Sequence, residues 1–244
     1  MTVDFWGTLL LDPPSGDNRY KRRRMADFET ILGDLGITVT PVTLDRAYEA
    51  SAGFLGRTWA RNRDVPVTEH VRAILAAVDC GLPARVPAEA MTALVDAYAR
   101  PALLVPPSVD AGARPAFARL QAEGVTLALV SNTMRTPGVV LRQVLDRLGL
   151  LACFTHTTFS DEVGIRKPDP EIFALTLRAI QVDPAAAVHV GDDPVLDVAG
   201  ARQAGLRVIQ VTSAPLRSLR AQRPDAVIPS LATLPEALAS LDRG

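Results

Sequence analysis

Cysteine is scarce in this chain of 244 residues, which holds only Cys80 and Cys153. The two do not form a C-x-x-C pair, so the sequence indicates neither a disulfide framework nor a zinc site. Long apolar runs are also missing, because none approaches the roughly 20 residues that a membrane span needs. The N-terminus lacks the basic region and long apolar stretch of a signal peptide. We therefore expect a cytoplasmic protein without a membrane contact.

An excess of charge of either sign is missing too. The formal net charge is −1, so nothing indicates nucleic acid or an anionic membrane as a partner. The one basic cluster, residues 21–24, is interpreted as the solvated start of a helix rather than a polyanion site. The hydrophobic share of 48% and charged share of 22% are typical of a soluble globular protein. This length accommodates one core with a satellite domain, or two small domains.

Between the prolines at 13–14 and 106–107, the sequence shows helical periodicity and no alternating strand pattern. Apolar residues recur at helical spacing, and glycine or proline ends several of the segments. The expected helices cover residues 25–35, 43–55, 71–78 and 88–98, after a loop at 11–16. We interpret residues 13–107 as an α-helical cap domain inserted into another domain.

After residue 107 the pattern changes to alternating helices and strands, which is typical of a doubly wound parallel sheet. The expected strands are 125–130, 154–159, 187–190, 206–211 and 226–228. The expected helices are 111–123, 139–148, 170–180, 196–204 and 234–241. With a first strand at residues 2–3, the predicted fold class is α/β: a Rossmann-like core of residues 1–12 and 108–244, with the helical cap inserted.

The first strand ends in an acidic residue, Asp4, and Gly7 then permits a sharp turn. Ligands of open parallel sheets bind at the carboxyl ends of the strands. Asp4 is therefore a nucleophile, a metal ligand or a residue that caps the turn. Only three residues precede it, so the strand is either unusually short or starts upstream of Met1.

Three further polar stretches follow predicted strands, and the alternation alone places them at the same edge of the sheet as Asp4. With residues 4–9 (Asp-Phe-Trp-Gly-Thr-Leu), these are Val130-Ser131-Asn132-Thr133, Arg166-Lys167-Pro168-Asp169-Pro170, and Val190-Gly191-Asp192-Asp193 with Asp197. In this order, the four stretches resemble the motifs of the haloacid dehalogenase-like hydrolase superfamily, in its helical-cap form. The resemblance extends over nearly the whole chain.

The resemblance implies that Asp4 is a nucleophile that forms an aspartyl intermediate. Thr8 would hold the turn, and the Ser131 hydroxyl would donate to a bound anion beside Asn132, a substrate-binding residue. Lys167 would stabilise the charge that develops during the reaction. A simpler reading of residues 131–132 is a helix cap, and of residues 166–167 a solvated loop pair.

The acidic residues of the fourth stretch would repel one another and Asp4 unless a cation neutralised them. A hard divalent ion with oxygen ligands is the natural cation, and Mg²⁺ is the expected one. By resemblance, the ligands are Asp4, the backbone carbonyl of Trp6 and Asp192, with Asp193 and Asp197 in support. One of these carboxylates is instead explained by capping of a helix.

Trp6 departs from the pattern, because the family's phosphatases usually carry a second Asp there as acid and base. Indole does not titrate in the relevant range. The family's dehalogenases also lack an acid at this place. Their active sites resemble metal-free ones, however, with neutral side chains where this chain has Asp192 and Asp193. The expected function is a Mg²⁺-dependent phosphatase of a small phosphorylated metabolite. The alternatives are a hydrolytic 2-haloacid dehalogenase and a catalytically weak binding or regulatory protein.

The substrate itself is not readable from the sequence, because cap residues that face the cleft select it. The candidates Arg57, Trp59, Arg61 and Arg63 are explained as well by a solvated surface. The expected partner is a small molecule, and the expected assembly is a monomer or a homodimer.

Overall fold

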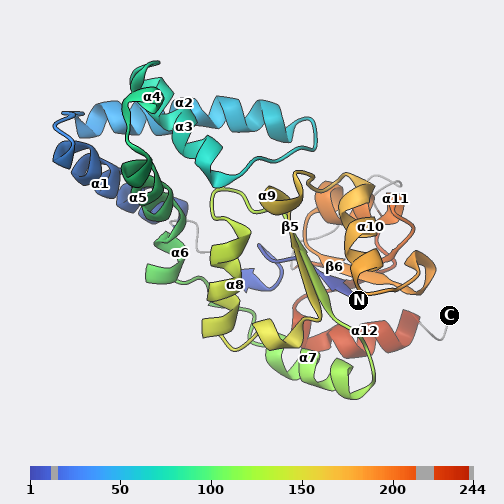
Figure 1. The fold of residues 1–244 in the computed structure, drawn as a ribbon. Helices are drawn as coiled ribbons and strands as arrows, with labels where there is room; N and C mark the ends of the chain where they lie inside the picture. Colours follow the sequence, from blue (N-terminus) through green and yellow to red (C-terminus); the bar gives the residue numbers. More distant parts are fainter. Residues whose placement is uncertain (12–15, 213–222, 242–244) are drawn as a thin grey trace.

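Within residues 1–11, 16–212 and 223–241, which the computed structural model describes, six parallel strands form one sheet in the order β5-β4-β1-β6-β7-β8 (Figure 1). The strands are β1 (Thr2–Val3), β4 (Ala128–Ser131), β5 (His156–Phe159), β6 (Val188–Gly191), β7 (Arg207–Val211) and β8 (Ala226–Ile228). The chain leaves β1 in one direction through β4 and β5, and in the other through β6 to β8. The predicted doubly wound α/β fold is confirmed, with its switch point at β1.

β1 has only two residues, both buried, yet it lies between β4 and β6 in the middle of the sheet. Thr2 pairs with Ala128 on one side and with His189 on the other. The pairing continues one residue further, because the Asp4 amide donates to the Val190 carbonyl at 2.8 Å. Asp4 is thereby held at the carboxyl edge of the sheet.

Helices cover both faces of the sheet, and each face has its own apolar cluster. Val3 and Leu129 belong to the cluster that includes Phe117, whereas Val130 and Val208 belong to the cluster around Phe173. Figure 1 shows α7, α8 and α12 on one side, and α10 and α11 on the other. These helices are α7 (Ala113–Ala122), α8 (Gly138–Arg147), α10 (Pro170–Ala179), α11 (Gly200–Gln203) and α12 (Leu234–Leu241). A short helix, α9 (Ser160–Val163), follows β5.

The segment between Gly16 and Leu104 is helical, and it lies beyond the carboxyl edge of the sheet (Figure 1). Its helices are α1 (Gly16–Asp34), α2 (Pro41–Trp59), α3 (Val67–Val78), α4 (Leu82–Arg85), α5 (Ala88–Ala99) and α6 (Pro101–Leu104). They share a separate core that includes Phe28, Leu44 and Ile74. This arrangement agrees with an inserted helical cap.

The two connections to this segment run side by side as an antiparallel pair, β2 (Leu10–Leu11) and β3 (Ser108–Val109), which the sequence pattern did not indicate. The predicted division at 12–13 and 107–108 lies next to this pair, and residues 12–15 are outside the described residues. The expected loop at 11–16 therefore also falls mostly outside them. α1 begins at Gly16, before residues 21–24, which were expected to start the helix.

The prediction that residues 21–24 are solvated is wrong for Arg24, which is only 1% exposed. Arg22 and Arg23 are exposed, but Arg24 lies on the inner face of α1 and its guanidinium donates to the Tyr98 carbonyl at 2.8 Å and the Tyr48 hydroxyl at 3.0 Å. A guanidinium can be buried where its donors find acceptors. A run of four like charges on a helix necessarily covers more than one face, and one member here points inward.

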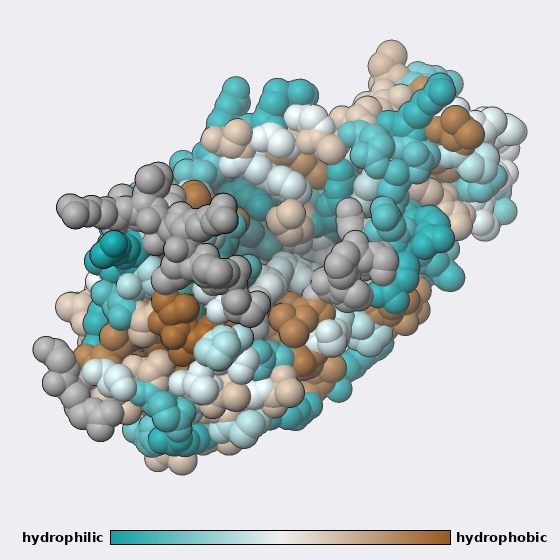
Figure 2. Space-filling view, turned by 180° about the vertical axis from the view of Figure 1, so that it is seen from behind, coloured by the Kyte–Doolittle hydropathy of each residue, from teal (hydrophilic) through white to brown (hydrophobic). Residues whose placement is uncertain are grey.

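The two cysteines are free thiols. In the described part of the chain, no helix combines the length and apolarity that a bilayer crossing requires. The view of Figure 2 shows hydrophilic and hydrophobic residues mixed over the surface, with the hydrophobic ones in separate patches.

Candidate active site

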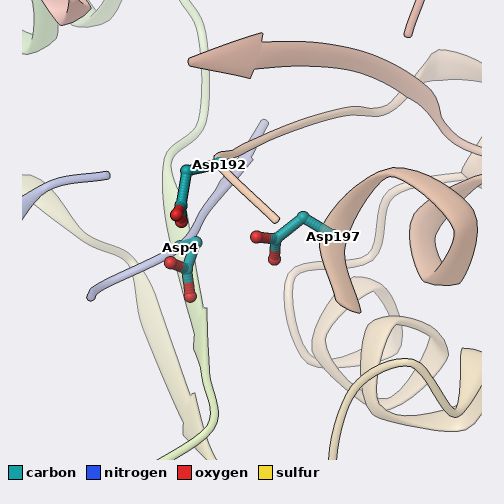
Figure 3. A group of neighbouring side chains, drawn as sticks. All are labelled: Asp4, Asp192 and Asp197. Carbon is teal, nitrogen blue, oxygen red and sulfur yellow. The ribbon is translucent and has the colours of Figure 1, made fainter. Parts of the chain in front are cut away.

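Three carboxylates from separate parts of the chain converge at the carboxyl edge of the sheet. Asp4 follows β1, Asp192 follows β6, and Asp197 lies in the helical turn after it (Figure 3). One oxygen of each carboxylate lies within 4.8 Å of an oxygen of the others. Asp4 and Asp197 are buried, and Asp192 is half-buried. Parallel strands bring these residues together, because their carboxyl ends meet at one edge.

Lys167 lies among these carboxylates and is only 3% exposed. Its ammonium group donates to Asp4 Oδ1 and, at 2.6 Å, to Asp197 Oδ1. Burial lowers the pKa of Lys167, but the Asp197 and Asp4 carboxylates outweigh burial and hold the pKa above its ordinary value. The ammonium group therefore stays charged. The alternative that Arg166 and Lys167 form a solvated loop pair is excluded, because both are buried.

Asn132 holds the backbone of Lys167 in place. Its amide nitrogen donates to the Lys167 carbonyl at 3.0 Å, and its amide oxygen accepts from the Lys167 amide at 2.9 Å. This pair of bonds gives Asn132 a positioning part, whereas its predicted contact with substrate stays a prediction. Ser131 is buried at the end of β4, and its hydroxyl donates to the Asn132 carbonyl at 3.3 Å. Its predicted contact with an anion also stays a prediction.

Asp197 is held on both of its oxygens. Besides Lys167, Oδ1 accepts from His189 Nε2 at 3.0 Å, and Oδ2 accepts from the Asp193 amide at 3.0 Å. Burial raises the pKa of Asp197, but the opposing effects of Lys167 and His189 are larger and hold the pKa below its ordinary value. The carboxyl group is therefore ionised. His189 Nδ1 lies 2.9 Å from the Thr2 hydroxyl, and burial lowers the histidine's pKa. A neutral ring that donates from Nε2 and accepts at Nδ1 satisfies both contacts.

His189 was not among the sequence candidates. It is a polar residue in the apolar strand β6, and one of its two side-chain partners, Thr2, is far away in the chain. A buried imidazole in a strand is usually a satisfied core residue, so the pattern alone carried no signal.

Asp193 turns away from the other carboxylates and caps the next helical turn. Its Oδ1 accepts from the amides of Val195 at 2.7 Å and Leu196 at 2.8 Å. That turn, η3 (Pro194–Ala199), is π-helical and runs into α11, where the sequence predicted one helix over 196–204. The capping alternative thus describes Asp193, and any support of a metal by it stays a prediction.

Asp192 is positioned by the turn that follows β1. The Thr8 hydroxyl donates to Asp192 Oδ1 at 3.1 Å, which joins the first and fourth motifs directly. Gly7 makes room for this contact: its φ is +82°, and a Cβ there would lie 2.6 Å from Asp192 Oδ2. The Gln210 amide donates to the Asp192 carbonyl at 2.9 Å and holds the backbone from the β7 side.

Gly7→Ala is expected to displace the Asp192 carboxylate and to destabilise the fold by about 1–3 kcal/mol, because the new Cβ meets carboxylate oxygens at a strained φ. The melting temperature measures the second effect. Gly36→Ala is the matched control, since its φ is +74° but no atom lies within 4 Å of the added Cβ. Equal losses in the two variants would show that φ alone matters and that Asp192 is not crowded by Gly7.

Trp6 lies beside this turn, half-buried, with its ring edge-on to Phe5 at 4.9 Å between centroids. Its indole nitrogen is buried and, among the described residues, no acceptor lies within hydrogen-bond distance. The structure therefore places an apolar ring where the family's phosphatases usually carry an acid. The predicted ligation by its carbonyl stays a prediction.

A second buried ion pair joins the helical segment to the loop that carries Arg166 and Lys167, and sequence reasoning missed it. Asp64, from the segment between α2 and α3, accepts from Arg166 Nη1 at 2.7 Å and from the Trp59 indole at 3.0 Å. The Arg166 guanidinium also lies 4.3 Å from the centre of the Trp59 ring. Arg63 is paired with Asp169 at 2.9 Å. The remaining cap candidates, Arg57 and Arg61, are exposed.

Charge at the site is unbalanced, because in the described part of the chain three carboxylates face one lysine. Burial and repulsion by Asp197 raise the pKa of Asp4 to about 7, against the lowering effect of Lys167. Burial and Asp197 also raise the pKa of Asp192 to about 6. Hard carboxylate oxygens at this spacing fit a divalent cation such as Mg²⁺, which would relieve the repulsion.

Comparison with known proteins supports the resemblance to the haloacid dehalogenase-like hydrolases. The sequence model of the haloacid dehalogenase-like hydrolases matches residues 2–205. The chain is 40% identical to phosphoserine phosphatase of Thermus thermophilus over 110 residues, which are 45% of this chain and 41% of the relative. It is 34% identical to glyceraldehyde 3-phosphate phosphatase of Pyrococcus furiosus over 100 residues, 40% of either chain. These alignments thus span less than half of each curated relative.

Two solved structures resemble the chain over almost its full length. A 2-haloacid dehalogenase from Pseudomonas syringae has a TM-score of 0.73 at 28% identity and covers 98% of this chain and 97% of its own. A HAD phosphatase from Thermococcus onnurineus has a TM-score of 0.60 at 23% identity, with coverages of 97% and 96%, and shows the shared fold. Since the family model covers most of the sequence and the fold agrees, the chain belongs to the haloacid dehalogenase-like hydrolases.

Proposed function

We propose that this hydrolase is a Mg²⁺-dependent phosphatase of a small phosphorylated metabolite. The supporting observation is the cluster of Asp4, Asp192, Asp197 and Lys167 at the carboxyl edge of the sheet, in which all but the half-buried Asp192 are buried. Its net negative charge suits a divalent cation, and a cation attracts a phosphate group. We assign substrate selection to the cap of residues 13–107, which lies over the core of residues 1–12 and 108–244.

Asp4 is the proposed nucleophile. Lys167 holds Oδ1 of its carboxylate, so we assign the attack to Oδ2. A bond forms between this oxygen and phosphorus, and the bond from phosphorus to the leaving oxygen breaks. Water then attacks phosphorus, the bond from phosphorus to Oδ2 breaks and the carboxylate is restored, while the two protons of the water leave with inorganic phosphate. Lys167 offsets negative charge through both steps, because its ammonium group is anchored by Asp197.

Asp4, Asp192 and the carbonyl of Trp6 are the proposed ligands of Mg²⁺, with Asp197 held nearby by Lys167 and His189. When bound, the ion would neutralise phosphate charge and favour in-line attack. Thr8 and Gly7 set the position of Asp192 in this arrangement, as their contacts indicate. Asn132 keeps Lys167 within reach of Asp4.

A 2-haloacid dehalogenase is the second candidate, and two observations favour it. Trp6 stands where a proton donor is needed for an alcohol but not for a halide, and the Pseudomonas syringae structure that resembles the chain is a 2-haloacid dehalogenase. The experiment that separates the candidates is a panel of phosphate esters with and without Mg²⁺, run beside a chloroacetate assay. Phosphate release that requires Mg²⁺ supports the phosphatase, whereas metal-independent chloride release would overturn it. A catalytically weak binding protein would do neither.

Mg²⁺ is expected to raise the melting temperature more at about pH 8 than at about pH 5. The raised pKa values of Asp4 and Asp192 mean that the folded protein binds more protons than the unfolded chain between about pH 4 and pH 7. Without a metal, the stability from these groups therefore falls as the pH rises through this window. Mg²⁺ binds the deprotonated carboxylates and offsets that loss.

Differential scanning fluorimetry with MgCl₂, against an equal ionic strength of NaCl, measures this effect without any turnover. Asp192→Asn is the matched variant, because it removes one proposed ligand and keeps the size of the side chain. A shift of equal size at both pH values, or one that persists in Asp192→Asn, would contradict the metal site.

A further inference from the structure

A cavity of about 490 Å³ lies between the cap and the core, next to the turn that carries Trp6. Its core side is formed by Trp6 and residues 133–136, directly after the Ser131-Asn132 motif. Its cap side is formed by residues of α1 and α2, namely Tyr20, Arg24, Tyr48, Glu49, Ala52 and Trp59. The volume is typical of a site for a small molecule.

Aromatic rings form much of the wall, and both tryptophans of the chain, Trp6 and Trp59, are among them. Two of the rings are held in place by cations. The Arg135 guanidinium lies 4.1 Å from the centre of the Tyr48 ring, and the Arg166 guanidinium lies 4.3 Å from that of Trp59. Rings fixed in this way present a preformed apolar surface, which favours a flat ligand.

Positive charge accompanies these rings. Arg24 is buried and donates to carbonyl and hydroxyl oxygens, including the Arg135 carbonyl at 2.9 Å, but none of the described carboxylates pairs with it. Among the described residues of the cavity wall, Glu49 is the one acidic side chain, and it pairs at 2.5 Å with Lys21, which also pairs with Asp45 at 2.6 Å. A buried guanidinium without a counterion is costly unless an anion approaches it. The described wall thus carries two guanidinium groups, Arg24 and Arg135, against one carboxylate, Glu49.

We infer that this cavity binds the leaving group of the substrate, and that the leaving group is an aromatic or similarly flat apolar body that carries a carboxylate. The inference rests on the proposed phosphatase function for the identity of the reaction, but the binding of the carboxylate does not depend on it. The ring would lie against Trp6 and Trp59, and the carboxylate would face Arg24. The hydroxyl oxygen esterified to phosphate would then point past Trp6 towards Asp4.

Benzoate and benzamide test this inference directly, because they have the same shape and differ in charge. Both tryptophans line the cavity, so quenching or a shift of the intrinsic tryptophan emission reports occupancy. Benzoate is expected to bind about tenfold more tightly than benzamide, as a charge-assisted contact would provide. Equal affinities, or no change in emission with either compound, would overturn the inference.

Arg24→Gln is expected to abolish the preference for benzoate, and Arg23→Gln is its matched control. Both substitutions remove one charge from α1, but Arg23 is exposed and is paired with Asp27 at 3.3 Å. Circular dichroism shows whether Arg24→Gln folds, and the comparison of the two ligands on the unchanged protein is decisive if it does not. A folded Arg24→Gln variant that still prefers benzoate would overturn the role of this charge.

Turnover separates this inference from the proposed function. We expect 4-carboxyphenyl phosphate to exceed 4-carbamoylphenyl phosphate in kcat/KM by about tenfold. Equal turnover of both esters would leave the phosphatase intact and contradict the carboxylate site. Benzoate binding without turnover of any phosphate ester would leave the site intact and contradict the phosphatase.

Discussion

Asp4→Asn is expected to lower kcat on any phosphate ester by about 10⁴-fold or more, because it removes the nucleophile of the proposed mechanism. The amide is a poor nucleophile, and it cannot form the mixed anhydride with phosphate. The substitution also removes one buried negative charge, so the fold is not expected to suffer: Asp197 still pairs with Lys167 at 2.6 Å. Stopped assays of phosphate release measure the loss, and a melting curve shows that the variant is folded.

Asp193→Asn is the matched control, since it is a neighbouring change of the same chemistry. Its carboxylate caps the turn at Val195 and Leu196 rather than facing Asp4, and Asn is also a good cap. We expect kcat to change by less than about tenfold. Rapid quenching and intact mass measurement of the unchanged protein should reveal a phosphorylated form that Asp4→Asn lacks. If Asp4→Asn retained its rate while Asp193→Asn lost it, the assignment of the nucleophile would be wrong.

Trp6 is expected to make the enzyme sensitive to its leaving group. Without a general acid, the rate at which an alcohol is expelled falls by a factor of about 10²–10⁴. An aryl or acyl leaving group needs no proton, because it is already a stable anion. Aryl phosphates should therefore turn over faster than alkyl phosphates by a factor of this order. The attack of water on the intermediate also lacks a base, so a burst of the leaving group should precede the steady state.

Two substitutions test this account of Trp6. Trp6→Asp should raise the rate on alkyl phosphates more than the rate on aryl phosphates, because it restores a titratable group next to the turn. Trp6→Phe keeps an apolar ring without an acid, so it should preserve the dependence on the leaving group. Equal rates on both substrate classes in the unchanged protein would mean that another residue supplies the proton. A cap residue would then be the first place to look.

The sequence by itself determined the α/β fold with its inserted helices, and it placed the four polar stretches at one edge of the sheet. Both conclusions depend on local patterns, because apolar periodicity distinguishes helices from strands and parallel strands align their carboxyl ends. Asp4 and Asp192 stand out in the sequence for the same reason, since each directly follows a strand, whereas Lys167 comes later, after β5 and α9. The ends of the helices were predicted less accurately, as α1 begins at Gly16 and not at residues 21–24.

Only the tertiary structure decided which of these side chains meet. Asp193 and Asp197 look equivalent in the sequence, but the π-helical turn sends one to cap backbone amides and the other to Lys167. His189, Asp64 and Arg24 gave no signal, because a buried polar residue is recognised by its partners, and each of the three has a partner far along the chain. Partners of this kind depend on the packing of whole elements, which local sequence patterns do not encode.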